Sequence, residues 1–373
     1  MGDWKKYKLS DVAEIQTGPF GSQLHQSDYK PVGTPIITVE HLGENKILHD
    51  NLPLVGDEDK ERLKKYILQE GDIVFSRVGS VDRRAYVSNR EHGWMFSGRC
   101  LRVRTNGDLA YSKYLSYYFG QESFKEYIRM IAVGATMPSI NTEILSGIEV
   151  VLPSLPEQKS IASILSSLDD KIDLLHRQNQ TLEALAETLF RQWFVEEPEE
   201  EWEKGKLGDV IELIYGKGLK EEIRSGSGFP VVGSSGVVGY HSDFLVKGPG
   251  IVIGRKGTLG KVIYLFENFF PIDTTYFIKS KVNSEGLFYE YFLLKTLNFE
   301  DMNSDSAVPG LNRDIALSTE IKIAPFDKLR QYNGYCASLF KKLKQNNSQI
   351  RTLTRLRDAF LPKLMSGEVR VNN

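Results

Sequence analysis

Two short segments of the chain place an arginine among small residues at the end of an apolar run. They are GDIVFSRVGS at residues 71–80 and PGIVIGRKGT at residues 249–258. Glycine lets a backbone come close to a ligand, and an arginine beside it can reach a phosphate or the edge of a guanine. The pattern predicts DNA contacts by Arg77, Ser80, Arg83, Arg84, Arg255, Lys256 and Thr258. A tight hairpin whose arginine forms a salt bridge is the alternative that the sequence leaves open.

The motifs of common catalytic centres are missing from the sequence. The stretch GRKGTLGKV at residues 254–262 is not a phosphate-binding loop, because Val262 stands where Ser or Thr must follow the lysine. No HExxH, GxSxG or EF-hand pattern occurs, and the six histidines are scattered without ligand spacing. Cys100 and Cys336 are the only cysteines and belong to no CxxC or Cys/His pattern. We therefore expect neither catalytic residues nor a metal site in this chain.

Charge is distributed unevenly along the chain, although the net charge is only −2. Six of the eight residues from 196 to 203 are Glu, whereas residues 328–370 hold ten Lys and Arg against two acidic residues. Residues 71–104 hold seven Arg against three acidic residues. This stretch predicts a positive face, with an ordinary solvated surface as the alternative.

The composition is that of a globular protein, with 41% hydrophobic and 26% charged residues among 373. No run of eighteen apolar residues occurs, and the start of the sequence is polar and rich in lysine. We therefore expect no membrane span, no signal peptide and a cytoplasmic location.

The sequence contains an internal repeat. Residues 4–18 and 202–216 share eight identities in fifteen positions at an offset of 198, and the two arginine segments align at an offset of 178. A third match, at an offset of 171, aligns Pro138, Asn141 and Ile144 with Pro309, Asn312 and Ile315. The chain is therefore expected to consist of two homologous halves that differ in their loops.

Each half begins with short runs rich in Val, Ile, Tyr and Phe between Gly, Pro, Asn and Ser residues, which is typical of strands and turns. Helical spacing at residues 112–130 and 286–297 adds one or two helices to each sheet. The predicted fold class is α+β, with two β-rich domains in tandem, separated by two long helices. The predicted boundaries are 1–153 and 198–325 for the β-rich domains, and 154–197 and 326–373 for the helical regions.

The two helical regions carry matching heptad patterns. Ten layers step by four and three from Ile161 to Trp193, and ten more run from Tyr332 to Leu364. We predict an antiparallel coiled coil, which returns the end of the chain to the first domain and creates a pseudo-two-fold axis. Asn179 is the sixth layer of one helix and Asn346 the fifth of the other, so only an antiparallel pair lets these amides face each other. Two separate amphipathic helices with surface asparagines are the alternative.

Two different β-rich domains, each followed by a long helix, resemble the specificity (S) subunit of Type I restriction-modification systems. The segments that carry the resemblance are the repeated 4–18 and 202–216, LPSLPEQKSIASILSSLDDKI at 152–172, LFRQWF at 189–194 and LPKLMSGEVRV at 361–371. The second helix begins with APFDKLRQY at 324–332 and lacks the Leu-Pro-Glu-Gln run of the first. The contacts of the two helices with other subunits therefore need not be equivalent.

The resemblance implies a non-catalytic subunit that recognises double-stranded DNA. Its two target recognition domains would each bind one half of a bipartite, gapped site. Its helices would set the gap and hold two methyltransferase (M) subunits, which support restriction (R) subunits; S-adenosylmethionine, ATP and Mg²⁺ would belong to those partners. A β-domain enzyme that acts on nucleotides and dimerises through a coiled-coil stalk is one alternative, and a scaffold or adhesin that binds no DNA is another.

Overall fold

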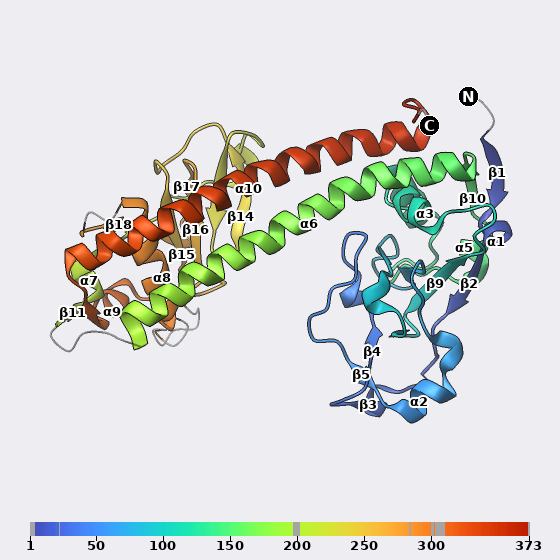
Figure 1. The fold of residues 1–373 in the computed structure, drawn as a ribbon, viewed down its shortest axis with the longest axis horizontal. Helices are drawn as coiled ribbons and strands as arrows, with labels where there is room; N and C mark the ends of the chain where they lie inside the picture. Colours follow the sequence, from blue (N-terminus) through green and yellow to red (C-terminus); the bar gives the residue numbers. More distant parts are fainter. Residues whose placement is uncertain are drawn as a thin grey trace. The chain divides into compact units, whose positions relative to one another are not determined.

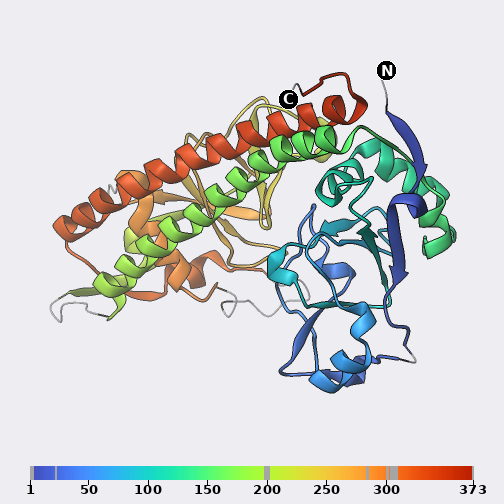
Figure 2. The same cartoon turned by 45° about the vertical axis from the view of Figure 1, so that its right-hand side comes forward.

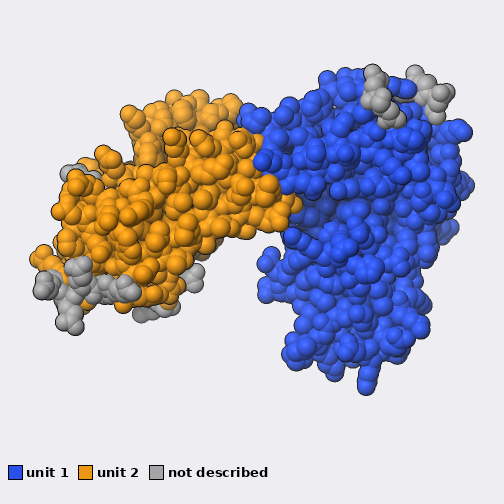
Figure 3. Space-filling model, in the orientation of Figure 1, with its two compact units in different colours: residues 1–172, 352–373 blue, residues 173–351 orange. Residues whose placement is uncertain are grey.

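The computed structural model describes residues 4–21, 23–196, 202–282, 285–299, 302 and 310–371. The chain forms two compact units, which Figure 3 distinguishes by colour. The first unit contains residues 1–172 and 352–373, and the second contains residues 173–351. Each unit therefore holds one β-rich domain and one part of each of two long helices.

The β-rich domain of the first unit is built from three small sheets (Figure 1). Its four-stranded antiparallel sheet has the order β2 (Ala13–Thr17), β9 (Cys100–Thr105), β6 (Ile73–Ser76) and β7 (Arg84–Tyr86). The other sheets are β3 (Tyr29–Lys30), β5 (Leu54–Val55), β4 (Thr34–Ile37) and β8 (Met95–Phe96), and the pair β1 (Lys5–Lys8) and β10 (Glu149–Leu152). The helices are α1 (Leu9–Val12), α2 (Asp57–Arg62), α3 (Ser112–Tyr118), α4 (Glu122–Ile131) and α5 (Thr142–Ser146).

The second unit repeats this plan. Its four-stranded sheet has the order β12 (Ile211–Tyr215), β18 (Thr275–Ser280), β15 (Gly250–Gly254) and β16 (Val262–Leu265). The other sheets are β14 (Gly236–His241), β13 (Phe229–Gly233) and β17 (Phe270–Pro271), and the pair β11 (Glu203–Lys206) and β19 (Glu320–Ile323). The helices are α7 (Leu207–Val210), α8 (Phe288–Thr296) and α9 (Arg313–Leu317). The sequence repeat thus corresponds to a repeated fold.

The apolar runs that lead to the two predicted arginine turns are buried strands. In β6, Ile73 and Phe75 pack into one hydrophobic core, and Val74 packs into another on the opposite face of the sheet. The residues of β15 alternate between two cores in the same way. Because side chains alternate across a strand, burial on both faces requires an unbroken apolar run. The arginine that follows each run lies at the edge of the core.

Helices α6 (Leu155–Arg191) and α10 (Phe326–Ser366) contain 37 and 41 residues, and α6 continues into a π-helical turn at Gln192–Glu196. In the second unit they run antiparallel, since the Trp193 ring lies 6.2 Å from that of Tyr332 and Asn179 hydrogen-bonds to Asn346. These are the layer pairs that the heptads predict. Figures 1 and 2 show the helices side by side. The predicted antiparallel coiled coil is confirmed.

The coiled coil of the first unit departs from the heptad prediction at one layer. Ile161, Leu165 and Leu364 are buried in the core of the domain, as the pattern predicts. Phe360, which is assigned to the same seam, is 39% exposed. The apolar contact surface between the helices is therefore incomplete at this layer.

Each long helix is anchored to its domain by one buried amide. The Gln158 side chain of α6 accepts a hydrogen bond from the Tyr111 N–H and donates to the carbonyls of Leu109 and Pro153, at 2.8, 2.9 and 3.0 Å. In the second unit, the Asn333 side chain accepts from the Tyr289 N–H at 3.0 Å. The anchoring amide has moved by one helical turn, which explains why the second helix lacks the Leu-Pro-Glu-Gln run.

The end of α10 belongs to the first domain. Leu364 and Met365 are buried in its core, and the Trp4 ring packs so closely on Gly367 that a Cβ atom there would lie 3.2 Å from it. The chain therefore returns to the domain in which it starts. No helix in the described ranges is long and apolar enough to cross a membrane.

Candidate nucleic-acid interface

In each unit the arginine turn contacts the Pro-x-x-Asn motif of the third repeat match. The Ile140 N–H donates to the Arg77 carbonyl at 2.9 Å, and the Leu311 N–H donates to the Arg255 carbonyl at 3.0 Å. These pairs are equivalent under the offsets of 178 and 171 found in the sequence. Two motifs that lie more than fifty residues apart therefore form one structural feature, and it occurs once in each unit.

The repeated asparagine of this motif is a helix cap. Asn141 accepts a hydrogen bond from the Ile144 N–H at 2.8 Å at the start of α5. Asn312 accepts from the Asp314 and Ile315 N–H groups, at 2.9 and 3.1 Å, at the start of α9. The cap explains why asparagine recurs at this position. Its role is to hold the segment that supports the arginine turn.

Both leading arginines are held against aromatic rings. The Arg77 guanidinium lies 5.6 Å from the centre of the Phe20 ring and donates to the Gly98 carbonyl at 3.1 Å. The Arg255 guanidinium lies 5.1 Å from the Tyr215 ring and 5.8 Å from the Tyr276 ring. Cation–π contacts of this kind orient a guanidinium without neutralising its charge. Each turn thus presents a positioned, half-buried cation.

The turns themselves are exposed and have the same backbone geometry. Gly79 and Gly257 both adopt positive φ angles, of 75° and 79°, which a residue with a Cβ atom rarely adopts. Ser80, Lys256 and Thr258 lie on the exposed surface of these turns. Their positions agree with a role in ligand contact.

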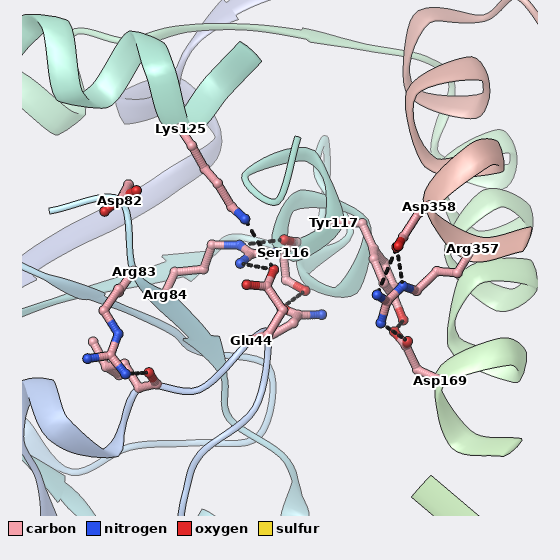
Figure 4. Close-up of polar contacts among 12 residues, drawn as sticks. Glu44, Asp82, Arg83, Arg84, Ser116, Tyr117, Lys125, Asp169, Arg357 and Asp358 are labelled. Carbon is pink, nitrogen blue, oxygen red and sulfur yellow. Dashed lines mark hydrogen bonds and ion pairs between the residues drawn. The ribbon is translucent and has the colours of Figure 1, made fainter. Parts of the chain in front are cut away.

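Arg83 and Arg84 lie next to each other but have different surroundings (Figure 4). Arg83 is half-buried and donates to the Leu42 carbonyl. Arg84 is 3% exposed, and its guanidinium donates to the Ser116 carbonyl and to Glu44, both at 3.1 Å. The structure therefore does not support the predicted DNA contact by Arg84, because its guanidinium is committed inside the domain.

The electrostatics around Arg84 follow from this burial. Burial lowers the pKa of Arg84, and the carboxylate of Glu44 opposes that change. Burial acts to raise the pKa of Glu44, but the Arg84 and Lys125 cations outweigh it, so the pKa is lowered. The cluster is a structural ion pair with a third partner.

Two further arginines of the predicted positive face are also committed to the fold. The Arg102 side chain is 2% exposed and pairs with Glu14 at 2.6 Å. Arg104 pairs with Asp72 at 2.6 Å. Together with Arg84, three of the seven arginines in residues 71–104 are used internally. The positive face of the first domain is therefore smaller than the sequence count indicates.

An apolar loop beside the first arginine turn was not predicted from the sequence. The Gly79 N–H donates to the Pro138 carbonyl at 2.8 Å, which places residues 133–139 next to the turn. Val133 and Met137 in this loop are 64% and 61% exposed. Exposed apolar residues beside a positioned cation extend the candidate interface of the first domain.

The coiled coil contains two polar layers. In the second unit, the Asn346 amide donates to the Asn179 Oδ1 atom at 2.9 Å, and the Asn179 amide donates to Asn347 at 2.8 Å. In the first unit, Arg357 pairs with Asp169 at 3.0 Å, and Asp169 accepts from the Tyr117 hydroxyl at 2.6 Å (Figure 4). The predicted Asn179–Asn346 contact is thus present.

In the described part of the chain, no cluster of three or more His, Cys, Asp and Glu could hold a metal ion. Both cysteines are buried free thiols. Burial raises the pKa of the Cys100 thiol to about 12, which keeps it protonated at neutral pH.

The chain was compared with families, curated proteins and solved structures. Residues 1–184 and 199–332 match the model of the Type I restriction modification DNA specificity domain. A relative over nearly the whole chain is the Type I restriction enzyme MjaIX specificity subunit of Methanocaldococcus jannaschii, with 26% identity over 99% of this chain and 94% of the relative. The HindI specificity subunit of Haemophilus influenzae is 28% identical over 52% of this chain and 42% of its own. The crystal structure of the S subunit from M. genitalium has a TM-score of 0.65 at 20% identity and covers 97% of this chain and 96% of its own, so the two share a fold.

Proposed function

Because the chain belongs to the Type I restriction-modification DNA specificity family, we propose that it selects the DNA sequence on which partner subunits act. Each β-rich domain is a target recognition domain that binds one half of a bipartite, gapped site. The coiled coil joins the domains and sets the number of base pairs between the half-sites.

One observation in particular supports this proposal: the two units build the same arginine turn on the same partner segment. Arg77 and Arg255 receive equivalent backbone hydrogen bonds, and each guanidinium rests on an aromatic ring. A protein that contacts a bipartite site needs two equivalent contact surfaces that differ in detail. The different loops around the two turns then allow different half-sites.

The chemistry belongs to other subunits in this proposal. Two methyltransferase subunits bind the helices and modify adenine with S-adenosylmethionine, and restriction subunits use ATP and Mg²⁺. This chain supplies sequence choice and register without catalytic residues, and it acts in the cytoplasm. The family match does not support the alternative of a nucleotide-acting enzyme with a dimerisation stalk.

The experiment that tests the proposal is reconstitution with the cognate methyltransferase subunit. We expect methylation of genomic DNA at one gapped sequence when both proteins are present and at none when either is omitted, as read by methylome sequencing. The double variant Arg77→Ala with Arg255→Ala, shown to be folded by circular dichroism, serves as the matched control and should lose most methylation. Methylation by this chain alone, or methylation without sequence preference, would overturn the proposal.

A further inference from the structure

The second domain contains a polar hollow beside its arginine turn. Its volume is about 270 Å³. The side chains that line it are contributed by β12, the turn after β15, β18 and the start of α9. The lining residues used below are Tyr215, Arg255, Lys256 and Arg313.

Two guanidinium groups share one aromatic ring at this hollow. Arg255 lies 5.1 Å and Arg313 5.7 Å from the centre of the Tyr215 ring, which is itself 49% exposed. Lys256 adds a third positive charge to the lining. Like charges held this close repel each other unless an anion lies between or beside them.

The acids around the hollow do not neutralise these cations. Within the described residues, Arg255 forms no ion pair, and its buried Nε atom has no hydrogen-bond partner. Arg313 is 3.3 Å from Asp314, its neighbour in sequence, whose side chain is 82% exposed. An exposed pair of this kind contributes little binding energy, so Arg313 is available to another anion.

The first domain lacks this arrangement. The offset of 171 that aligns the Asn caps places Thr142 at the position of Arg313, and the offset of 198 places Thr17 at the position of Tyr215. Arg77 is therefore held by Phe20 and the Gly98 carbonyl, without a second guanidinium on the same ring. The hollow with two arginines is a property of the second domain alone in the aligned pair of turns.

We infer that this hollow binds one backbone phosphate of the DNA, held between the guanidinium groups of Arg255 and Arg313. Two arginine forks beside one another suit the paired oxygens of a phosphodiester, and the charge-assisted hydrogen bonds are stronger than neutral ones. The inference rests on the proposed function, since the DNA supplies the anion. It assigns to the second domain a phosphate contact that the first domain does not make, so the two half-sites are held with unequal electrostatic strength.

The test is a methylphosphonate scan of the target duplex, which replaces one charged phosphate at a time by a neutral group. The complex of this chain with its methyltransferase binds each duplex in filter-binding or fluorescence titrations. For the native complex, we expect one neutralised phosphate near the second half-site to weaken binding about tenfold. The Arg313→Thr variant, which gives the hollow the residue of the first domain, should bind the unmodified duplex about tenfold more weakly and lose its sensitivity at that position.

Salt dependence provides a second measurement on the same variants. Removing one phosphate contact should reduce the slope of log K against log salt by about one unit and weaken all DNA sequences equally. Lys204→Ala, which removes one exposed positive charge from β11 outside the hollow, is the matched control and should leave the scan unchanged. If Arg313→Thr instead relaxes the choice of one base pair, or if no phosphate shows dependence on Arg313, the inference is wrong. Loss of all sequence-specific binding by the native complex would contradict the proposed function itself.

Discussion

The side chain of Asn346 is completely buried and donates a hydrogen bond to the Asn179 Oδ1 atom across the coiled coil, at 2.9 Å. The Asn346 Oδ1 atom accepts no hydrogen bond within the described residues. One buried amide is therefore satisfied only in part, and only in this register. A polar layer of this kind specifies direction and register at a cost in stability.

We expect Asn179→Leu alone to lower stability by about 1–3 kcal/mol, because the buried Asn346 amide loses its acceptor. The double variant Asn179→Leu with Asn346→Leu should keep or raise the melting temperature, since both polar groups are removed together. It should also loosen the preferred gap between half-sites, as measured by methylome sequencing. Asn347→Ala is the control, and it should cost less because Asn347 is only half-buried. A double variant that is less stable than either single variant would contradict this explanation.

The two arginine turns should affect different half-sites. Arg77→Ala and Arg255→Ala should each weaken DNA binding by about 1–3 kcal/mol if the guanidinium contacts a base, with relaxed choice at one base pair. The relaxed position should lie in one half-site for Arg77 and in the other for Arg255, because the arginines belong to separate units. Arg90→Ala, an exposed arginine outside the turn, is the control. Relaxation in the same half-site for both variants would exclude a separate half-site for each turn.

Arg84 should contribute to stability and not to DNA binding. Arg84→Ala should lower the free energy of unfolding by about 1–3 kcal/mol, because it removes a buried hydrogen bond and the packing of the side-chain stem. Arg84→Met, which keeps much of the packing, should cost less. For the folded protein, the salt slope of DNA binding should match that of the native chain. A reduced slope in Arg84→Met would restore the predicted DNA contact.

The Glu44 cluster should make the first unit sensitive to acid. Because the pKa of Glu44 is lowered in the folded protein, its contribution to stability is complete above the unfolded-state pKa and is lost as the pH falls through the folded-state value. Glu44→Gln should therefore be less stable than the native chain at neutral pH, and the difference should shrink as the pH falls toward about 3. Urea denaturation at several pH values measures this. A difference that stays constant with pH would exclude the ionised carboxylate as its source.

Gln158 should hold the first helix to its domain. Gln158→Leu leaves three backbone groups without their side-chain partner, and we expect a loss of about 3 kcal/mol in the free energy of unfolding. Gln158→Glu, which keeps an acceptor for the Tyr111 N–H, should lose less. Because Gln158 is fully buried, folded variants should bind the methyltransferase as the native chain does. Weaker methyltransferase binding at unchanged stability would identify Gln158 as a subunit contact.

The features that could be predicted from the sequence depend on local spacing or on repetition. The heptads fix which layers face each other once the helices are antiparallel, so counting layers was enough to pair Asn179 with Asn346. The burial of arginines could not be predicted in this way, because their acidic partners lie far away in sequence. Glu44 is 40 residues from Arg84, and Glu14 is 88 residues from Arg102. Such pairs depend on loops whose paths the sequence does not specify.

The return of α10 to the first domain affects how such a protein can change in evolution. A recombination event within α6 would exchange residues 1–172 as a block, but residues 352–371 would still come from the resident gene. The incoming domain would have to accept Leu364 and Met365 in its core and Gly367 against its first tryptophan. New DNA specificities acquired by such an exchange are therefore restricted to domains whose surface at this helix end is already compatible.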